Sequence, residues 1–234
     1  MRASRLLAIT AAGALALTAC SGGKGVNTGS GSTASGGSSS GKTLVAAVSA
    51  RPDQFDPHKT SAYPSFQVLE NVYDTLVVPN PTNLKMEPSL ATKWTTSSDN
   101  LTWTFTLRDG VTFHDGSTFD STDVVYSYKR IISEKLANSY RFANVKDVTA
   151  PDPKTVVITL TKPTPNLLAL IGAFKGMAIL PENAAKTHDL TKQTDGTGPF
   201  ELVSSDATHT VLKAFPKYWG GTPKIGGVDF RYIT

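Results

Sequence analysis

The chain has 234 residues, of which 39% are hydrophobic and 18% charged, and its 23 basic and 19 acidic residues give a formal net charge of +4. The basic residues form no run and do not alternate with aromatic residues, so the sequence gives no support to nucleic-acid binding. A single cysteine, Cys20, excludes an intrachain disulfide, and the folded part must therefore be held together by its core.

The first twenty residues have the pattern of a bacterial export signal. Arg2 and Arg5 precede an apolar stretch at residues 6–17, which is shorter than the roughly 20 residues that span a bilayer. The residues LTAC then end at Cys20, the pattern of a lipoprotein cleavage and lipidation site. We expect residues 1–19 to be a signal peptide, whose loss lowers the formal charge from +4 to +2, and Cys20 to carry a diacylglyceryl anchor. The alternative for Cys20 is a buried structural thiol.

Residues 21–41 are rich in Gly and Ser and nearly free of apolar residues, so they cannot build a core. We expect residues 20–42 to form a flexible tether. The run GGSSSGKT at residues 36–43 matches the phosphate-binding P-loop pattern, but that loop has to follow a strand and open a helix. Here a linker precedes the match and a strand-like segment follows it, so nucleotide binding is not expected.

Strands and a helix are predicted between residues 43 and 107. The apolar run at residues 43–48 predicts a strand in the interior of a sheet. Ser65 is placed to cap a helix, and residues 76–78 predict a short strand. The apolar side of this helix is formed by Phe66, Leu69, Val72 and Tyr73. Residues 102–107 alternate between large apolar side chains and threonines, the pattern of a strand with one buried face.

Turn pairs and caps divide the rest of the chain. Turns predicted at residues 109–110 and 115–116 enclose a short strand at 111–113. A cap among residues 120–122 starts a helix that continues to Ile131. Downstream, the pattern predicts a hairpin of residues 146–149 and 155–160, short helices after Pro165 and Pro181, and strands at 200–203, 210–214 and 228–233. Helices and strands mix without a strict βαβ repeat, which predicts a mixed α/β fold.

No catalytic or metal-binding constellation emerges from the residues. The four histidines lack metal-ligand spacing; they are His58, His114, His188 and His209. In the sequence DPH at residues 56–58, the acid and the imidazole are neighbours on a proline-bent loop and are not expected to face one another. No serine or cysteine lies with a histidine and an acid in a strand-end context. Gly196 and Gly198 indicate a close approach of two backbone segments, and Trp219 is expected to anchor a loop.

Three blocks of sequence carry a resemblance to a known family. The first contains DPH at residues 56–58 and VYDTL at 72–76. The second is WTFTLRDGVTFHDG at 103–116, preceded by Trp94 and Asp99 and followed by DVVYS at 123–127. The third comprises GTGPF at 196–200, YWGG at 218–221 and VDFRY at 228–232. In this order the blocks resemble the extracellular solute-binding proteins of family 5, which serve peptide and nickel ABC importers.

The resemblance implies a mixed α/β (α+β) fold, namely a periplasmic-binding-protein-like lobe with an inserted β-rich subdomain. Residues 43–78 would begin lobe I, residues 79–196 would form the inserted subdomain, and residues 197–234 would return to lobe I. The second lobe of the family is missing from this sequence. We interpret the chain as either a fragment of a longer product or the product of a truncated gene.

The same resemblance implies a receptor that is not an enzyme. The segment with Ser61, Ala62 and Tyr63 corresponds to a stretch beside the bound solute, where free backbone groups pair with a peptide as an added strand. Tyr140 corresponds to a tyrosine that some peptide-binding members place at the mouth of the cleft. We expect a monomeric, lipid-anchored, extracytoplasmic protein without cofactor or metal. It would capture oligopeptides or dipeptides, close around them and deliver them to the permease subunits of an ABC importer.

Other interpretations stay open. The same fold also suits an oligosaccharide or a nickel chelate, because the specific contacts to the cargo lie mostly in the missing lobe. Two alternatives belong to a different class. A secreted hydrolase would need the catalytic constellation that the residues lack, and a structural surface lipoprotein stays possible if the second lobe is truly absent.

Overall fold

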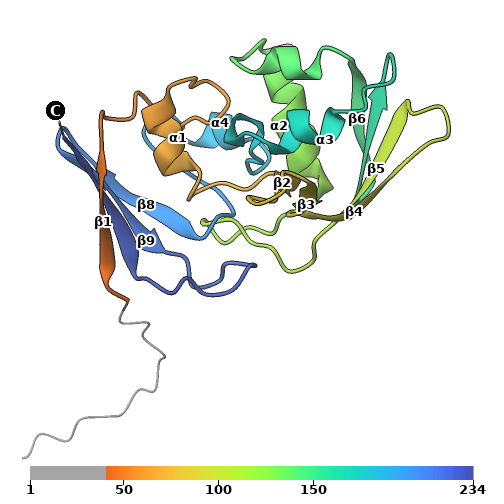
Figure 1. The fold of residues 1–234 in the computed structure, drawn as a ribbon. Coiled ribbons are helices and arrows are strands. Elements are labelled where there is room, and N and C mark those ends of the chain that lie inside the picture. Colours follow the sequence, from red (N-terminus) through yellow and green to blue (C-terminus); the bar gives the residue numbers. More distant parts are fainter. Residues whose placement is uncertain (1–40, 234) are drawn as a thin grey trace, which may run out of the picture. The chain divides into compact units, whose positions relative to one another are not determined.

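A computed structural model describes residues 41–233, and one four-stranded sheet joins the two ends of that region (Figure 1). This sheet, called sheet A, has the strand order β1-β10-β9-β8. Its strands are β1 (Thr43–Val48), β8 (Phe200–Ser205), β9 (His209–Ala214) and β10 (Gly227–Tyr232). β1 lies parallel to β10, and the other two pairs are antiparallel.

A second four-stranded sheet, called sheet C, is built from the middle of the chain and is antiparallel throughout. Its order is β4-β5-β7-β6, with β4 (Ala91–Thr96), β5 (Thr102–Leu107), β6 (Val145–Asp152) and β7 (Thr155–Leu160). A small hairpin of β2 (Val77–Pro79) and β3 (Met86–Pro88) precedes it. The predicted hairpin around residues 146–160 is confirmed as the β6–β7 pair.

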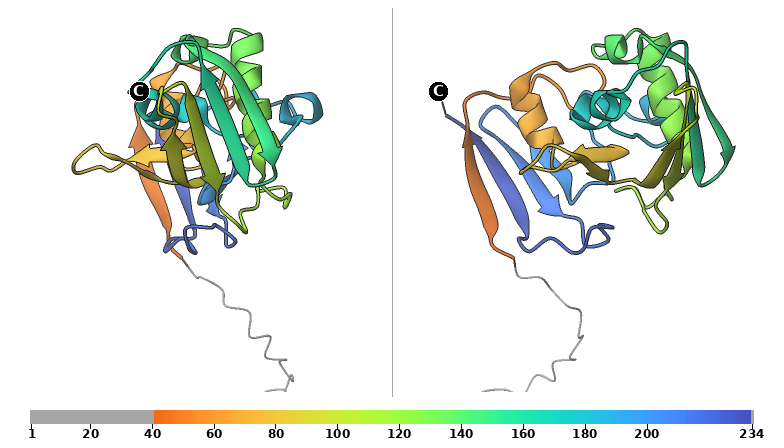
Figure 2. Two further views of the ribbon diagram at one scale, coloured as in Figure 1. Left: turned by 90° about the vertical axis from the view of Figure 1, so that its right-hand side faces the viewer. Right: turned by 45° about the vertical axis from the view of Figure 1, so that its right-hand side comes forward.

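Short helices connect and cover these sheets (Figure 2). The α-helices are α1 (Tyr63–Leu69), α2 (Ser121–Ser133), α3 (Leu167–Gly172) and α4 (Ala184–Thr187). Two 3₁₀ turns are η1 (Ser139–Phe142) and η2 (Lys175–Met177). Figure 1 shows α1 beside sheet A and α2 beside sheet C, in agreement with the contacts of α2 with β6 and β7.

The predictions for β5 and α2 are confirmed. Trp103, Phe105 and Leu107 form the buried face of β5, and the threonines between them are half-buried. Helix α2 begins at a capping box, in which an Asp120 oxygen accepts the N–H of Thr122 (2.7 Å). In return, an Asp123 oxygen accepts the N–H of Asp120 (2.8 Å). The mixed α/β fold class predicted from the sequence is therefore confirmed.

The buried apolar side chains of the described region form two clusters. The larger lies between sheet C, α2 and the β2–β3 hairpin, and the smaller lies between sheet A and α1. From Met177, the last residue of η2, to Leu180 in the link to α4, successive side chains enter different clusters in turn. Met177 and Ile179 join the larger cluster, whereas Ala178 and Leu180 join the smaller one. This segment therefore ties the two cores together.

The chain returns to sheet A through the glycine-rich segment that sequence analysis singled out. A Cβ atom on Gly198 would lie 2.6 Å from the carbonyl carbon of Val72, and one on Gly196 would overlap the Val72 carbonyl oxygen. His114 holds the same segment through two hydrogen bonds. Its backbone N–H donates to the Gly196 carbonyl (2.9 Å), and its ring Nε2 bonds the Gly198 carbonyl (3.0 Å). The predicted close approach is confirmed, and only glycine fits at these two positions.

The interior position predicted for the strand at residues 43–48 is wrong. Within residues 41–233, β1 is an edge strand of sheet A and pairs with β10 alone. Leu44 and Val45 are 54% and 55% exposed. A short apolar run is compatible with burial on both faces, but it carries no information about which strands lie beside it.

Three local assignments also differ from the sequence prediction. Helix α1 begins at Tyr63 with Ala62 as its N-cap, and Ser65 lies in the first turn instead of capping it. Residues 111–113 form no strand but a single bridge between Thr112 and Thr118. Strand β4 was not predicted, because its sequence ATKWTT has a single large apolar side chain, Trp94, and so shows no apolar alternation.

Candidate functional site

The predicted segment Ser61, Ala62 and Tyr63 leads from a buried loop into α1. The preceding residue, Thr60, is fully buried, and its hydroxyl donates to Asp53 Oδ1 (2.7 Å) and accepts the N–H of Ala62 (3.0 Å). Burial raises the pKa of Asp53, but hydrogen bonds from neighbouring hydroxyls outweigh this effect and hold the pKa below its usual value. An ionised carboxylate therefore fixes the loop from which the segment emerges.

The segment itself is largely open to solvent. Tyr63 is 72% exposed. The carbonyl of Ala62 accepts the N–H of Phe66, whereas the backbone of Ser61 makes no hydrogen bond within residues 41–233. Addition of a peptide strand needs free backbone N–H and C=O groups. Ser61 has both free, whereas the N–H of Ala62 is bound to the Thr60 hydroxyl and its C=O to the N–H of Phe66.

Tyr140 lies on η1 and is 67% exposed. The neighbouring Arg141 places its guanidinium carbon 5.5 Å from the centre of the Tyr140 ring and 5.3 Å from that of Phe174. Phe174 packs on Phe66 of α1 with 4.1 Å between ring centres, and Phe66 lies one turn after Tyr63. These contacts link the two predicted regions, and we call the residues Ser61, Ala62, Tyr63, Tyr140, Arg141 and Phe174 the Tyr63–Tyr140 surface.

A buried ion pair fixes the loop that leads to this surface. The two terminal nitrogens of Arg130 donate to the two carboxylate oxygens of Asp56, at 2.7 and 3.1 Å. The same guanidinium lies 3.0 Å from Nδ1 of His58, whose Nε2 lies 2.9 Å from the Ala178 carbonyl. Burial lowers the pKa of His58 to about 4, so the ring is neutral at neutral pH. Its Nε2–H then donates a hydrogen bond to the Ala178 carbonyl, and its Nδ1 accepts one from Arg130.

Sequence analysis missed the role of Arg130, although it noted Asp56 and His58. As predicted, the acid and the imidazole do not pair with each other; both instead bind the guanidinium of Arg130, 72 or more residues away. No spacing rule connects such distant residues. A basic residue in the last turn of a helix already has an explanation, because it interacts favourably with the helix dipole. The sequence therefore gives no reason to assign Arg130 a distant partner.

A second buried carboxylate, Asp74, holds the segment that carries Phe174. Trp219 Nε1 and the Thr197 hydroxyl donate to Asp74 Oδ2 at 2.8 and 3.1 Å. Lys175 Nζ lies 3.7 Å from Asp74 Oδ1 and directly follows Phe174 in the chain. The prediction that Trp219 anchors a loop is confirmed, and the pair of Asp74 with Lys175 holds the chain next to Phe174 of the Tyr63–Tyr140 surface.

A hydroxyl, an imidazole and a carboxylate do meet at Thr208, His209 and Asp206, in the turn between β8 and β9. Thr208 donates its hydroxyl proton directly to Asp206 (2.7 Å), and its oxygen lies 2.8 Å from His209 Nδ1. Hydrogen bonds from Thr208 and His209 lower the pKa of Asp206 to about 2. This exposed group stabilises a turn, because the hydroxyl proton is donated to Asp206 and the same carboxylate oxygen accepts the backbone N–H groups of Thr208 and His209.

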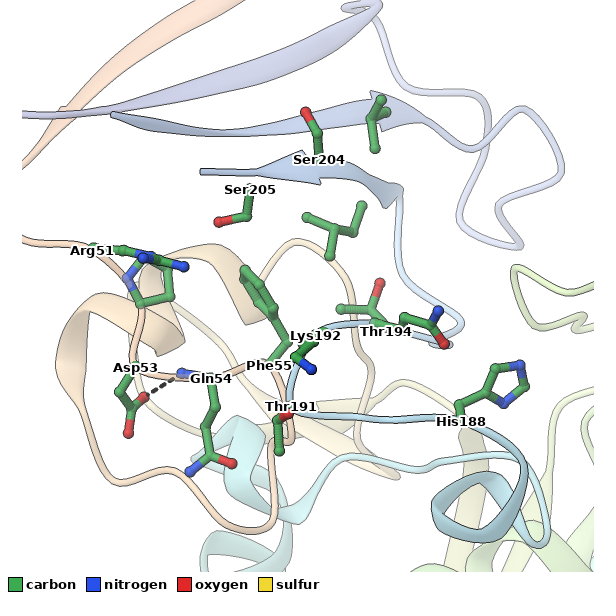
Figure 3. Close-up of a pocket in the computed structure, with 14 residues that line it drawn as sticks. Arg51, Asp53, Gln54, Phe55, His188, Thr191, Lys192, Thr194, Ser204 and Ser205 are labelled. Carbon is green, nitrogen blue, oxygen red and sulfur yellow. Dashed lines mark hydrogen bonds between the residues drawn. The ribbon is translucent and has the colours of Figure 1, made fainter. Parts of the chain in front are cut away.

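A cavity of about 580 Å³ lies elsewhere, beside the outer edge of β8 (Figure 3). Figure 3 shows side chains of β8 facing those of residues 51–55 and 191–194 across this space. Arg51 and Lys192 contribute positive charge, and Lys192 pairs with Asp189 at 3.2 Å. The predicted residues Ser61, Ala62, Tyr63 and Tyr140 do not line this cavity.

Two further properties of residues 41–233 concern metal binding and membrane crossing. In this range no three His, Cys, Asp or Glu side chains are grouped so as to hold a metal ion. None of the helices in the same range has the length and apolar character needed to cross a membrane. The predicted lipidation residue Cys20 lies outside the described residues.

Comparison with known proteins places these features in a family. The family described as "Bacterial extracellular solute-binding proteins, family 5 Middle" matches residues 85–234. The glutathione-binding protein GsiB of Salmonella paratyphi A is 31% identical over 201 residues, which cover 82% of this chain and 38% of GsiB.

Two solved structures resemble the fold. MoaA of A. tumefaciens R10, in complex with mannopinic acid, matches 82% of this chain and 41% of its own with a TM-score of 0.78 and 31% identity. DppA of Helicobacter pylori, in complex with the peptide STSA, matches 82% and 43% with a TM-score of 0.75 and 30% identity. Both are described as periplasmic binding proteins, so the predicted fold type is confirmed. The chain spans about two fifths of the length of these relatives.

Proposed function

The chain belongs to the bacterial extracellular solute-binding proteins of family 5, and from that membership we propose that it captures oligopeptides or dipeptides outside the cytoplasm and delivers them to the permease of an ABC importer. The observation that carries the proposal is the Tyr63–Tyr140 surface. It presents two highly exposed tyrosines and an arginine on a scaffold that buried carboxylates hold in place. The proposed action is binding and delivery, without catalysis.

The proposed contacts follow from the chemistry of this surface. Tyrosine rings offer apolar faces to side chains and a hydroxyl to polar groups, at a small loss of conformational entropy. The backbone of Ser61 offers an N–H and a carbonyl to the main chain of an extended peptide. Such contacts depend little on the side chains of the ligand, which suits a receptor that accepts many peptides. The relatives GsiB and DppA, with glutathione and the peptide STSA in their descriptions, support this ligand class.

We propose that the described part provides one lobe of a two-lobed receptor together with an inserted subdomain. Residues 43–78 and 197–234 are assigned to the lobe and residues 79–196 to the insert. Sheet A draws its strands from the first two ranges, and sheet C lies entirely in the third, which supports this division. Closure of a second lobe over the Tyr63–Tyr140 surface would trap the solute and signal its presence to the permease.

We also propose that the protein acts as a monomer held at the outer face of the cell membrane. Residues 1–19 direct export, Cys20 carries two acyl chains, and residues 20–42 connect this anchor to the folded part. Two acyl chains give stable attachment where one does not. The receptor therefore stays near the permease after each delivery.

Calorimetry on the longest gene product that contains these residues tests the proposal. Peptides of two to five residues are expected to bind, and Tyr63→Ala or Tyr140→Ala to weaken binding at least tenfold. Leu84→Ala is the matched control, because Leu84 is an equally exposed apolar residue (75%) outside this surface. If the tyrosine variants bind peptides as well as the control does, the assignment of the surface is wrong.

A second candidate ligand is a small acid that is not a peptide. MoaA, whose structure contains mannopinic acid, is as similar to this chain as the peptide-binding DppA. Competition in the same calorimetric cell separates the two candidates. A sugar-derived acid that displaces every peptide, while no peptide reaches micromolar affinity, would favour the second.

A further inference from the structure

Arg141 is the cation of the Tyr63–Tyr140 surface, and its side chain is held in one orientation. Its guanidinium lies near the rings of Tyr140 and Phe174, at 5.5 and 5.3 Å. Its Nε donates to Oδ1 of Asn138 at 3.3 Å, and Asn138 is itself only 5% exposed. Asn138 is packed tightly in turn, since a Cβ added to Gly176 would lie 2.5 Å from its amide nitrogen. The guanidinium is therefore preorganised by two rings and a buried amide.

The positive charge of Arg141 has no partner in the described part of the chain. Arg130 pairs with Asp56 at 2.7 Å, and Arg231 pairs with Asp229 at 3.0 Å. In contrast, no carboxylate of residues 41–233 lies within 4.0 Å of Arg141, and its two terminal nitrogens donate to no residue there. Four N–H groups of a half-buried guanidinium are thus available to a ligand.

The position of this cation suits the end of a ligand that also contacts α1. Phe174, one of the two rings beside Arg141, packs on Phe66 one turn from Tyr63. An extended solute that pairs with the Ser61 backbone and covers Phe174 would therefore bring one end to the guanidinium. The free nitrogens have the planar fork geometry that binds a carboxylate through two parallel hydrogen bonds.

We propose that Arg141 is a specificity-determining residue that binds a carboxylate of the solute, in a peptide its C-terminal group. This inference rests on the proposed function, because it assumes that the Tyr63–Tyr140 surface contacts the solute. It adds that the ligands are acids and that amidated or esterified peptides are poor ligands. The aromatic rings strengthen the interaction by excluding water from the faces of the guanidinium.

An NMR titration of the ¹⁵N-labelled 234-residue chain tests the inference with trialanine and trialanine amide as probes. The arginine Nε–Hε signals and the backbone amides of residues 61–63 and 140–141 are followed at millimolar peptide. We expect trialanine to shift the Arg141 signal and to bind at least tenfold more tightly than its amide, a difference of about 1.4 kcal/mol. Arg141→Gln should abolish this difference, and Arg141→Lys should keep part of it. Arg51→Gln, which removes an arginine from the cavity of Figure 3, should leave it unchanged.

Two other results would overturn the inference, and they differ in what they leave standing. If both peptides shift residues 61–63 and 140 with equal affinity, the surface binds peptides as proposed but Arg141 reads no carboxylate. If neither peptide shifts any of these signals, the proposed surface fails together with the inference. If the tenfold preference is lost in Arg51→Gln and kept in Arg141→Gln, the carboxylate is bound in the other cavity.

Discussion

Replacing Asp56 with Asn tests whether the buried ion pair holds the loop that leads to the Tyr63–Tyr140 surface. Asp56 and Arg130 are 1% and 4% exposed, and the shorter of their two hydrogen bonds is 2.7 Å. Among residues 41–233 the substitution leaves the guanidinium with one carboxylate within 4.0 Å, that of Glu134, which lies 3.7 Å from its Nε and is half-exposed to solvent, and with the neutral ring of His58. Removing one partner of a buried pair typically destabilises a protein by about 3–5 kcal/mol, because the other charge stays buried. We expect a loss in the free energy of unfolding of that size.

Urea unfolding followed by tryptophan fluorescence measures this loss. Asp147→Asn is the matched control, since Asp147 pairs with Lys129 at 3.2 Å and both side chains are about half-exposed. An exposed pair contributes about 0–1 kcal/mol, so the control should lose no more than that. The same substitution thus compares a buried and an exposed carboxylate in one protein.

The double variant Asp56→Asn with Arg130→Met removes both charges at once. Because apolar replacement of a whole buried pair is far less harmful than removal of one partner, the double variant should be more stable than Asp56→Asn alone. A loss below about 1 kcal/mol for Asp56→Asn, or a double variant less stable than the single one, would refute the reasoning.

The remaining predictions concern anchoring, packing, pH and affinity. Wild-type protein should partition into detergent, whereas Cys20→Ala should block lipidation and release the protein from the membrane. Unlipidated wild-type protein that retains its first 19 residues would contradict the anchor. Phe105→Ala should lower the free energy of unfolding by about 3–5 kcal/mol and Thr104→Ala by less than about 1 kcal/mol, so equal losses would show that the two faces of β5 do not differ in burial. The pKa of His58 is about 4 in the folded protein against 6.5 ordinarily, so the unfolded chain binds more protons between these values. Stability should be retained near neutral pH and fall as the pH drops from 6.5 toward 4, with a smaller fall in His58→Gln; equal slopes would contradict this role. Calorimetry on residues 20–234 alone should show no micromolar peptide binding, because these residues span about two fifths of the length of the relatives and provide the contacts of one proposed lobe; micromolar binding would show that this part is sufficient.

Local pattern was enough to predict the elements whose side chains alternate or repeat with one period. Residues 102–107 show strict alternation, and the capped helix after Asp120 has its apolar residues three and four apart. The glycines at 196 and 198 were recognised because close backbone approach excludes any other side chain. In these cases the residues that determine the local structure lie within a few positions of it in the sequence.

Features that depend on distant residues were out of reach. The edge position of β1 is decided by β10, and the role of Arg130 is decided by a loop more than 70 residues before it. Arg141 was passed over for the same reason, because its unpaired state is visible only once every nearby acid has been placed. The resemblance to a family pointed to Tyr63 and Tyr140, but it named neither the cation nor the phenylalanines that connect them.

The pairing of β1 with β10 determines when sheet A can form as the polypeptide is synthesised. Thr43 pairs with Gly227, so the closing contact of sheet A joins residues about 180 positions apart, and the loop between them must be ordered against a large entropy. Non-local pairing of this kind slows folding. Because β1 follows the proposed export signal and its partner is among the last strands described, sheet A stays incomplete until nearly the whole region has emerged from the ribosome. Closure of sheet A is therefore a late step of folding, and the residues of sheet C are all synthesised before it can take place.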